Sequence, residues 1–116
     1  MNIAVRAQGF ELSAAIDTFV RNDIRSTMAR FGDEIFSVDV FLKDTNGPKG
    51  GIDKQVLLRI QLRGGQKLVL QTIREDLYAA VRVSAKRAKR AIRRNLRKTR
   101  RLDKPGLRNF FANAPV

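Results

Sequence analysis

The sequence predicts an α+β fold in two layers, a four-stranded sheet that carries two helices on one face in the order βαβββα. Three observations support it. Apolar residues alternate at a period of two in four short segments, they recur every three or four residues in two longer ones, and Gly-rich stretches separate several of these segments. Two amphipathic helices must bury their apolar stripes, and one face of a sheet is the simplest surface that covers both.

The first strand and the first helix follow directly from this periodicity. Residues 2–8 alternate as a half-buried strand does, and one face collects Ile3, Val5 and Ala7. Ser13 is suited to cap the N-terminus of a helix, and Gly32 is suited to end it. Between them a core stripe recurs at three- or four-residue intervals, formed by Ile16, Val20, Ile24, Met28 and Phe31.

Three further strands are predicted at residues 35–43, 55–63 and 67–73. The middle one has the clearest alternation, since one parity holds Val56, Leu58, Ile60 and Leu62. Gly64 and Gly65 predict a tight hairpin turn after it, and DTNGPKGGID at residues 44–53 predicts a long loop before it.

The second helix is predicted to begin at Glu75 and Asp76, where carboxylates favour a helix N-terminus. The first strand, the first helix and the second strand form a crossover, so we expect those two strands to be parallel neighbours and the hairpins to be antiparallel. We assign residues 1–101 to one domain and residues 102–116 to a flexible C-terminal tail. In that tail Phe110 and Phe111 either contact bases or a partner, or fold back on the domain.

The composition narrows the function. The 116 residues contain 24 Lys and Arg against 11 Asp and Glu, a formal net charge of +13, which indicates an acidic partner such as nucleic acid. Cysteine and histidine are both absent, which removes disulfides, thiolate metal sites and histidine-based catalysis. No long apolar run or signal peptide is visible, so we expect a soluble cytoplasmic protein with no cofactor, no metal, no membrane partner and no small-molecule substrate.

The stretch SAKRAKRAIRRNLRKTRR at residues 84–101 sorts its residues by helical angle. At about 100° per residue, one side of the predicted helix holds Leu77, Val81, Ser84, Ala85, Ala88, Ile92, Asn95, Leu96 and Thr99. The other side holds Arg82, Lys86, Arg87, Lys89, Arg90, Arg93, Arg94, Arg97, Lys98, Arg100 and Arg101. A disordered tail would not sort its charges in this way, so we predict a helix with one buried face and one basic face.

No acidic residue lies between Asp76 and Asp103, so the like charges along this face repel one another. An anionic partner would neutralise them, and arginine matches phosphate through paired hydrogen bonds. A membrane surface is a weaker candidate, because the apolar side is rich in Ala and has no Trp or Phe. Catalysis is also disfavoured, since the adjacent carboxylates Asp33 and Glu34 lie at an element boundary without a nucleophile or a phosphate loop.

The segment EDLYAAVRVSAKRAKRAIRRNLRK at residues 75–98 resembles the last helix of the ribosome hibernation promoting factor family, also called the ribosome-associated inhibitor family. DLYAAV at residues 76–81 is similar to the family's opening signature, and the family's basic pattern falls on Arg87, Arg90, Arg94 and Lys98. GFELSAAIDTFV at residues 9–20 is similar to the start of the family's first helix. The resemblance covers about residues 1–100, and the chain resembles the short type.

The resemblance implies a protein that binds the small ribosomal subunit and its ribosomal RNA in the messenger and transfer RNA channel, inhibits translation and stabilises idle ribosomes under stress. Paired ribosomes are a further partner to consider, because long members carry an additional domain that pairs them. Two features depart from the family: Asp23 and Ser26 stand at positions that are commonly basic, and Arg82 and Lys86 stand where acids are common. The predicted RNA-binding residues are Arg82, Lys86, Arg87, Lys89, Arg90, Arg93, Arg94, Arg97, Lys98 and Arg101, with Arg21, Arg25 and Arg30 as a second candidate set.

Two other functions fit the same composition. A general nucleic-acid binder, such as a nucleoid protein or an RNA chaperone, would use the same phosphate contacts without a preferred site. An adaptor that binds an acidic protein would show no dependence on RNA. Selectivity for assembled small subunits over duplex DNA separates ribosome binding from the general binder, and dependence on RNA separates it from the adaptor.

Overall fold

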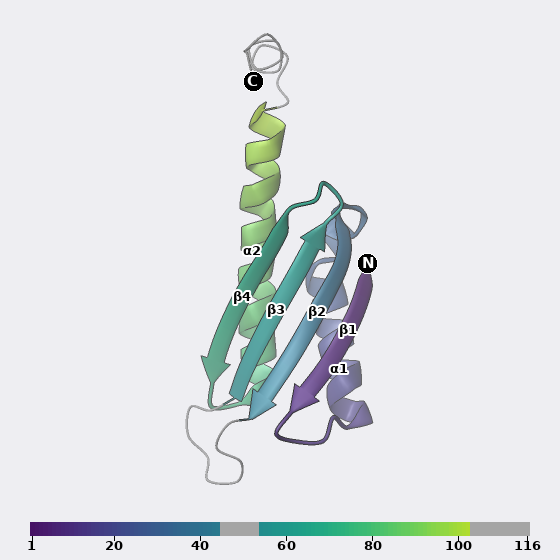
Figure 1. Cartoon of the computed structure of the whole chain (residues 1–116), viewed down its shortest axis with the longest axis vertical. Coiled ribbons are helices and arrows are strands. Elements are labelled where there is room, and N and C mark those ends of the chain that lie inside the picture. The colour runs from purple at the N-terminus through teal and green to yellow at the C-terminus, as the bar shows by residue number, and fades with distance from the viewer. Residues whose placement is uncertain (45–53, 103–116) are drawn as a thin grey trace.

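The computed structural model describes residues 1–44 and 54–102, with side chains described as far as Lys98. It contains β1 (Asn2–Gln8), α1 (Ala14–Thr27), the 3-10 helix η1 (Ala29–Glu34), β2 (Ile35–Asp44), β3 (Lys54–Leu62), β4 (Lys67–Arg74) and α2 (Leu77–Leu102). The strands form one sheet in the order β1-β2-β3-β4, and α1 and α2 both lie on one face of it (Figure 1). The predicted fold class and element order are confirmed.

The strand directions are also as predicted. β1 is parallel to β2, because α1 carries the chain back across the sheet, and the β2–β3 and β3–β4 pairs are antiparallel. The β3–β4 turn is closed by hydrogen bonds from the Leu62 amide to Gln66 and from the Gly65 amide to Leu62. Gly65 has a φ of +95°, a conformation that glycine adopts without strain.

Gly9 fixes the end of β1 beside the end of β2. Its φ is +88°, and a Cβ added there would lie 2.5 Å from the main-chain oxygen of Asp44. A side chain at this position would therefore clash with the neighbouring strand as well as strain the backbone. Glycine at this position therefore lets the chain pass close to the end of β2 as it turns from β1 toward α1.

The core lies between the sheet and the two helices. The inward parity of β3 predicted from the sequence is confirmed, since Val56, Leu58, Ile60 and Leu62 are each no more than 2% exposed. The first helix contributes Val20 and Ile24, both fully buried, and α2 contributes Val81 and Ile92 together with three alanines and Ser84. These small residues let the α2 backbone approach the sheet.

The first helix ends earlier than Gly32, the predicted end. It stops at Thr27, and the chain tightens into η1, where the Phe31 amide bonds to the Met28 carbonyl oxygen at 2.9 Å. A 3-10 turn has three residues per turn, so residues three apart lie on the same face. Met28 and Phe31 therefore both reach the core, and the predicted stripe is buried except for the half-buried Ile16, although the α-helix that was expected to carry it is interrupted.

Two predicted segments lie largely outside the described residues. These are the loop at residues 44–53, of which only Asp44 is described, and the tail with Phe110 and Phe111. Within residues 1–44 and 54–102, neither helix combines the length and the apolar content needed to cross a bilayer.

Candidate nucleic-acid interface

Helix α2 begins with a carboxylate cap. The two side-chain oxygens of Asp76 accept hydrogen bonds from the amides of Tyr78 and Ala79, at 3.4 and 3.3 Å. These bonds satisfy amides that have no partner within the helix, and the negative charge also favours a helix N-terminus. The start of α2 predicted at Glu75 and Asp76 is thus explained by a specific cap.

The apolar side of α2 is buried as the angular pattern predicted. Five of its residues are no more than 1% exposed: Val81, Ser84, Ala85, Ala88 and Ile92. Leu96 is half-buried at the far end, and Ala80, which the predicted stripe did not include, is also buried. Because this side is held against the sheet, the basic residues have a defined orientation along the helix.

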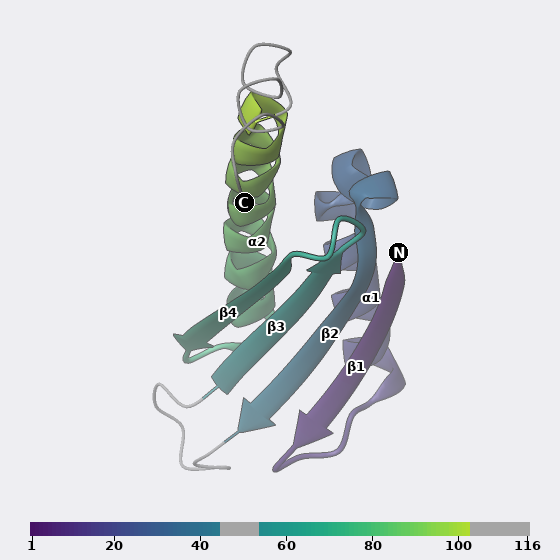
Figure 2. The same cartoon turned by 45° about the horizontal axis from the view of Figure 1, so that its top comes forward.

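The opposite side of α2 presents arginines and lysines to solvent. Seven of the predicted RNA-binding side chains are exposed, namely Arg82, Lys86, Arg87, Arg90, Arg94, Arg97 and Lys98. Lys89 and Arg93 are half-buried, and the side chain of Arg101 lies outside the described part. The helix spans 26 residues, about 39 Å at 1.5 Å per residue, and it continues past the ends of the strands (Figures 1 and 2).

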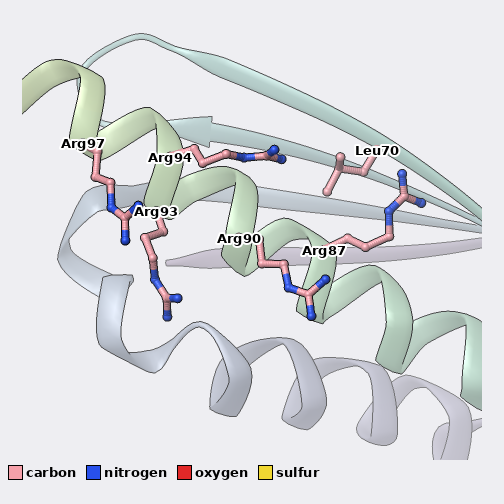
Figure 3. Close-up of a pocket in the computed structure, with 6 residues that line it drawn as sticks. All are labelled: Leu70, Arg87, Arg90, Arg93, Arg94 and Arg97. Atoms are coloured by element: carbon pink, nitrogen blue, oxygen red, sulfur yellow. The ribbon is translucent and has the colours of Figure 1, made fainter.

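A shallow hollow runs along the side of α2 that faces β4. Its volume is about 430 Å³, and the residues that line it are Leu70, Arg87, Arg90, Arg93, Arg94 and Arg97 (Figure 3). Arg94 and Arg87 extend toward the strands and Arg93 extends toward α1, so the guanidinium groups spread across the helix (Figure 3). Each group can donate paired hydrogen bonds to a phosphate, and their spread suits several phosphates along a nucleic-acid backbone.

A second hollow lies between η1 and the same helix. It has a volume of about 480 Å³ and is lined by Arg30, Phe31, Glu34, Arg93, Leu96 and Arg97. Arg93 and Arg97 line both hollows, so the two basic surfaces are continuous. The fold thus brings Arg30, from the second candidate set, next to α2. Glu34 is the acidic residue within this hollow.

Two of the predicted RNA-binding arginines also hold the sheet edges. Arg87 Nη1 donates to the Gln71 carbonyl oxygen at 2.7 Å and to Thr72 Oγ1 at 2.9 Å, which fastens α2 to the free edge of β4. Arg21 Nη1 donates to the Ile3 carbonyl oxygen at 2.7 Å, which fastens α1 to the free edge of β1. Unpaired edge strands invite association with other chains, and these bonds partly cover both edges.

The second candidate set is therefore divided. Arg21 is committed within the fold, since its Nε also bonds to both carboxylate oxygens of Asp17 at 3.0 Å. Arg25 and Arg30 are exposed, and neither side chain forms a hydrogen bond or an ion pair within residues 1–44 and 54–102. The sequence shows Asp17 four residues before Arg21, but the bond from Arg21 to β1 depends on contacts made in the folded chain.

Arg82 lies against an aromatic pair. Its guanidinium carbon is 5.5 Å from the centre of the Phe19 ring, and that ring meets Tyr78 edge to face at 4.7 Å. Such a contact between a cation and an aromatic face restrains the side chain. Arg82 is thus fixed at the boundary between the two helices, a contact that the helical pattern of either segment alone does not predict.

Asp23 of α1 faces the basic start of α2. Its Oδ2 is buried and accepts no hydrogen bond from the described residues. Burial raises the pKa of Asp23, and the positive charges of Arg82 and Lys86 lower it in part. The two departures from the resembled family thus meet in space, because the acid on α1 and the bases on α2 are close enough for their charges to interact.

Known proteins share both the sequence pattern and the fold. Residues 3–100 match the family model described as sigma 54 modulation protein / S30EA ribosomal protein, which confirms the family that residues 75–98 predicted. No curated protein matches the chain by sequence.

Two solved structures have the same fold. A ribosomal subunit interface protein from Coxiella burnetii is 18% identical, with a TM-score of 0.69 over 82% of this chain and 97% of that one. The N-terminal domain of Protein Y from Thermus thermophilus is 23% identical, with a TM-score of 0.68 over 81% and 98% of the two chains.

Proposed function

The chain belongs to the sigma 54 modulation protein / S30EA ribosomal protein family, and we propose that it binds the small ribosomal subunit through the basic side of α2. In this proposal α2 contacts ribosomal RNA in the channel for messenger and transfer RNA. The bound protein inhibits translation and keeps idle ribosomes inactive under stress. The proposal involves no catalytic step and no cofactor, and it places the protein in the cytoplasm with the ribosome.

The uncompensated charge of α2 is the observation that carries this proposal. Eleven basic residues and no acid occur between Leu77 and Leu102, and the buried stripe holds them in a fixed arrangement. Like charges at three- and four-residue spacing destabilise a helix, so this side is costly in the free protein. RNA phosphates would remove the repulsion and release their counterions, which makes binding favourable.

The shape of the surface supports a structured RNA as the partner. The arginines and lysines of α2 project from a rigid helix, so they suit phosphates that are themselves held at fixed positions. Double-stranded RNA holds its phosphates in this way and is recognised mainly through its shape and backbone. The Coxiella burnetii protein of similar fold is itself described as a ribosomal subunit interface protein, which agrees with the same class of partner. The family and the charged surface thus support one proposal independently.

Sedimentation with isolated small subunits tests this function. The purified protein is mixed with small subunits, with whole ribosomes and with an excess of duplex DNA at near-physiological salt. We expect saturable binding of about one protein per small subunit that persists in the presence of the DNA, together with inhibition of translation in a purified system. Loss of the protein to the DNA, or binding without a plateau, would instead support the general nucleic-acid binder.

A further inference from the structure

The face of the sheet opposite the helices forms a second surface with its own chemistry, and Figure 1 looks directly onto it. Alternate residues of β2 and β3 are buried under the helices and their neighbours on β1 and β4 are partly buried against the same core, so the other residues face outward. The strand register aligns these outward residues in rows, and the central row consists of Arg6, Phe41, Leu57 and Gln71. We call this surface the outer sheet face.

Phe41 is the centre of the outer sheet face. It lies on β2, an interior strand, and its side chain is half-buried. The guanidinium carbons of Arg6 and Arg59 are 6.0 and 5.6 Å from the centre of its ring. Phe41 has the opposite parity to the buried Val40 and Leu42 of β2, so it faces outward between the two cations.

A hollow of about 410 Å³ surrounds this ring. Phe41 and Leu57 give it an apolar lining, and three glutamines from different strands, Gln8, Gln55 and Gln71, border it. Gln71 Nε2 donates a hydrogen bond to Gln55 Oε1 at 3.3 Å, which orients two of these amides. Amide side chains offer both donors and acceptors, so they match the edges of nucleic-acid bases.

The charge of the outer sheet face is predominantly positive. Among the outward residues of the four strands, Arg6, Lys43, Arg59 and Lys67 are basic and Asp39 is acidic. Arg6 and Lys43 both line the hollow. The surface thus offers three kinds of contact to a nucleotide. The aromatic ring can stack on the base, the amides can bond to the edge of the base, and the cations can bind the phosphate.

From these observations we propose that the outer sheet face binds unpaired nucleotides of a single-stranded RNA, with one base stacked on Phe41. An open four-stranded sheet with an aromatic residue on an interior strand provides a platform on which splayed bases stack. Arginine planes also stack on bases, so Arg6 or Arg59 can cover the free side of a base that lies on Phe41. A paired base has both faces covered by its neighbours, which restricts this site to single strands.

A protein partner fits this surface less well. Val69 is 60% exposed and Ile73 is 38% exposed on the outer side of β4, but the centre of the face holds a cation and amides. The centres of protein interfaces are depleted in charged residues, whereas single-stranded nucleic acids combine bases with phosphates. The arrangement of charge around Phe41 therefore favours RNA over a protein or a second copy of this chain.

Amide chemical shifts measured by NMR test the proposal without a ribosome. The wild-type protein is titrated with a seven-nucleotide single-stranded RNA, with duplex RNA of equal phosphate number and with free nucleoside monophosphates. We expect the single strand to shift the amides of Phe41, Leu57 and Gln71, and duplex RNA to shift mainly those of α2. Free monophosphates should bind far more weakly than the oligomer, because the proposed site follows a strand and its backbone.

A matched pair of variants isolates the aromatic ring. Phe41→Leu keeps an apolar side chain but removes the stacking surface, and it should weaken binding of the single strand about 5- to 30-fold while leaving duplex binding unchanged. Phe36→Leu is the control, because Phe36 is a 46% exposed phenylalanine on the same strand that does not line the hollow. Folding of both variants is checked by their amide spectra before titration.

Three results would overturn the proposal. Single-strand shifts confined to α2 and η1 would assign all RNA binding to the helical side. Equal losses in Phe41→Leu and Phe36→Leu would remove the role of the ring, and shifts that depend on protein concentration alone would indicate self-association. None of these results bears on small-subunit binding by α2, which is measured separately by sedimentation.

Discussion

Helices α1 and α2 lie on the same face of the sheet, but they balance their charges in different ways. In α1, Arg21 is paired with Asp17 four residues earlier and is also bonded to β1. In α2 there is no acid to pair with any of the basic residues. The first helix satisfies Arg21 within the fold, whereas most cations of the second are exposed to solvent.

The packing of the two helices differs less than their charge. Val20 and Ile24 of α1 and Val81 and Ile92 of α2 are all buried in the core, and α2 adds three buried alanines. We therefore expect changes at the buried positions of α1 to act mainly on stability and changes on the exposed side of α2 to act mainly on RNA affinity. Substitutions in each helix test this separation of stability from RNA affinity. Substitutions where a helix contacts another element test its exceptions.

The largest expected effect is on stability, from Ile24→Ala in α1. Ile24 is fully buried, so the substitution removes apolar contacts and leaves a cavity. We expect the free energy of unfolding to fall by about 2–5 kcal/mol. Urea unfolding followed by circular dichroism measures this change, and at low temperature the folded fraction should still bind small subunits with wild-type affinity. Reduced affinity of the folded fraction would contradict the division between the helices.

Arg87 is an exception, because it belongs to the basic surface and also holds the edge of β4. Arg87→Ala removes the partner of Thr72 Oγ1, and Thr72 is only 2% exposed. We expect a loss of about 1–2 kcal/mol in stability together with weaker RNA binding. Arg90→Ala, at an exposed position on the same helix, is the control and should weaken binding without loss of stability. Equal stability of the two variants would show that the contact with β4 is unimportant.

A smaller effect is expected from Asp23→Asn, where the two helices meet. Burial raises the pKa of Asp23 in the folded protein, so the protonated form is favoured by folding. The stability that this group contributes is therefore greatest at a pH below its unfolded pKa, and it is lost as the pH rises through the raised folded value. We expect Asp23→Asn to be more stable than wild type at pH 7, and this advantage to vanish in acid. Melting temperatures at pH 7 and at about pH 3.5 measure the difference, and a destabilised variant at pH 7 would show that Arg82 and Lys86 outweigh desolvation.

Periodicity along the chain was sufficient to predict the fold. The alternation at Val56, Leu58, Ile60 and Leu62 identified an interior strand, and the angular sorting of residues in α2 distinguished its buried side from its basic side. Local patterns of this kind carry most of the information about which residues are buried. The break between α1 and η1 was not predicted, because it depends on how Phe31 packs after Met28.

Contacts between elements distant in sequence were not predictable in the same way. The bond from Arg87 to β4 and the position of Asp23 near Arg82 require the helix and sheet to be placed relative to each other. The bond from Arg21 to β1 likewise depends on the folded chain, whereas its other partner, Asp17, lies four residues earlier on the same helix. The sequence therefore predicted the basic surface as a whole, and the structure distinguished which of its residues also serve the fold.

The salt dependence of small-subunit binding tests the role of α2 most directly. The variant R90E/R94E is compared with R63E/R74E, a control with the same change in net charge at exposed positions outside α2 and outside the outer sheet face. If α2 contacts RNA phosphates, the first variant should bind far more weakly, and its slope of log K against log salt should be shallower by roughly two. The control should stay close to wild type, and both variants should remain folded. Equal losses in the two variants would mean that only net charge matters, which would contradict the account of α2 as a specific ribosome-binding surface.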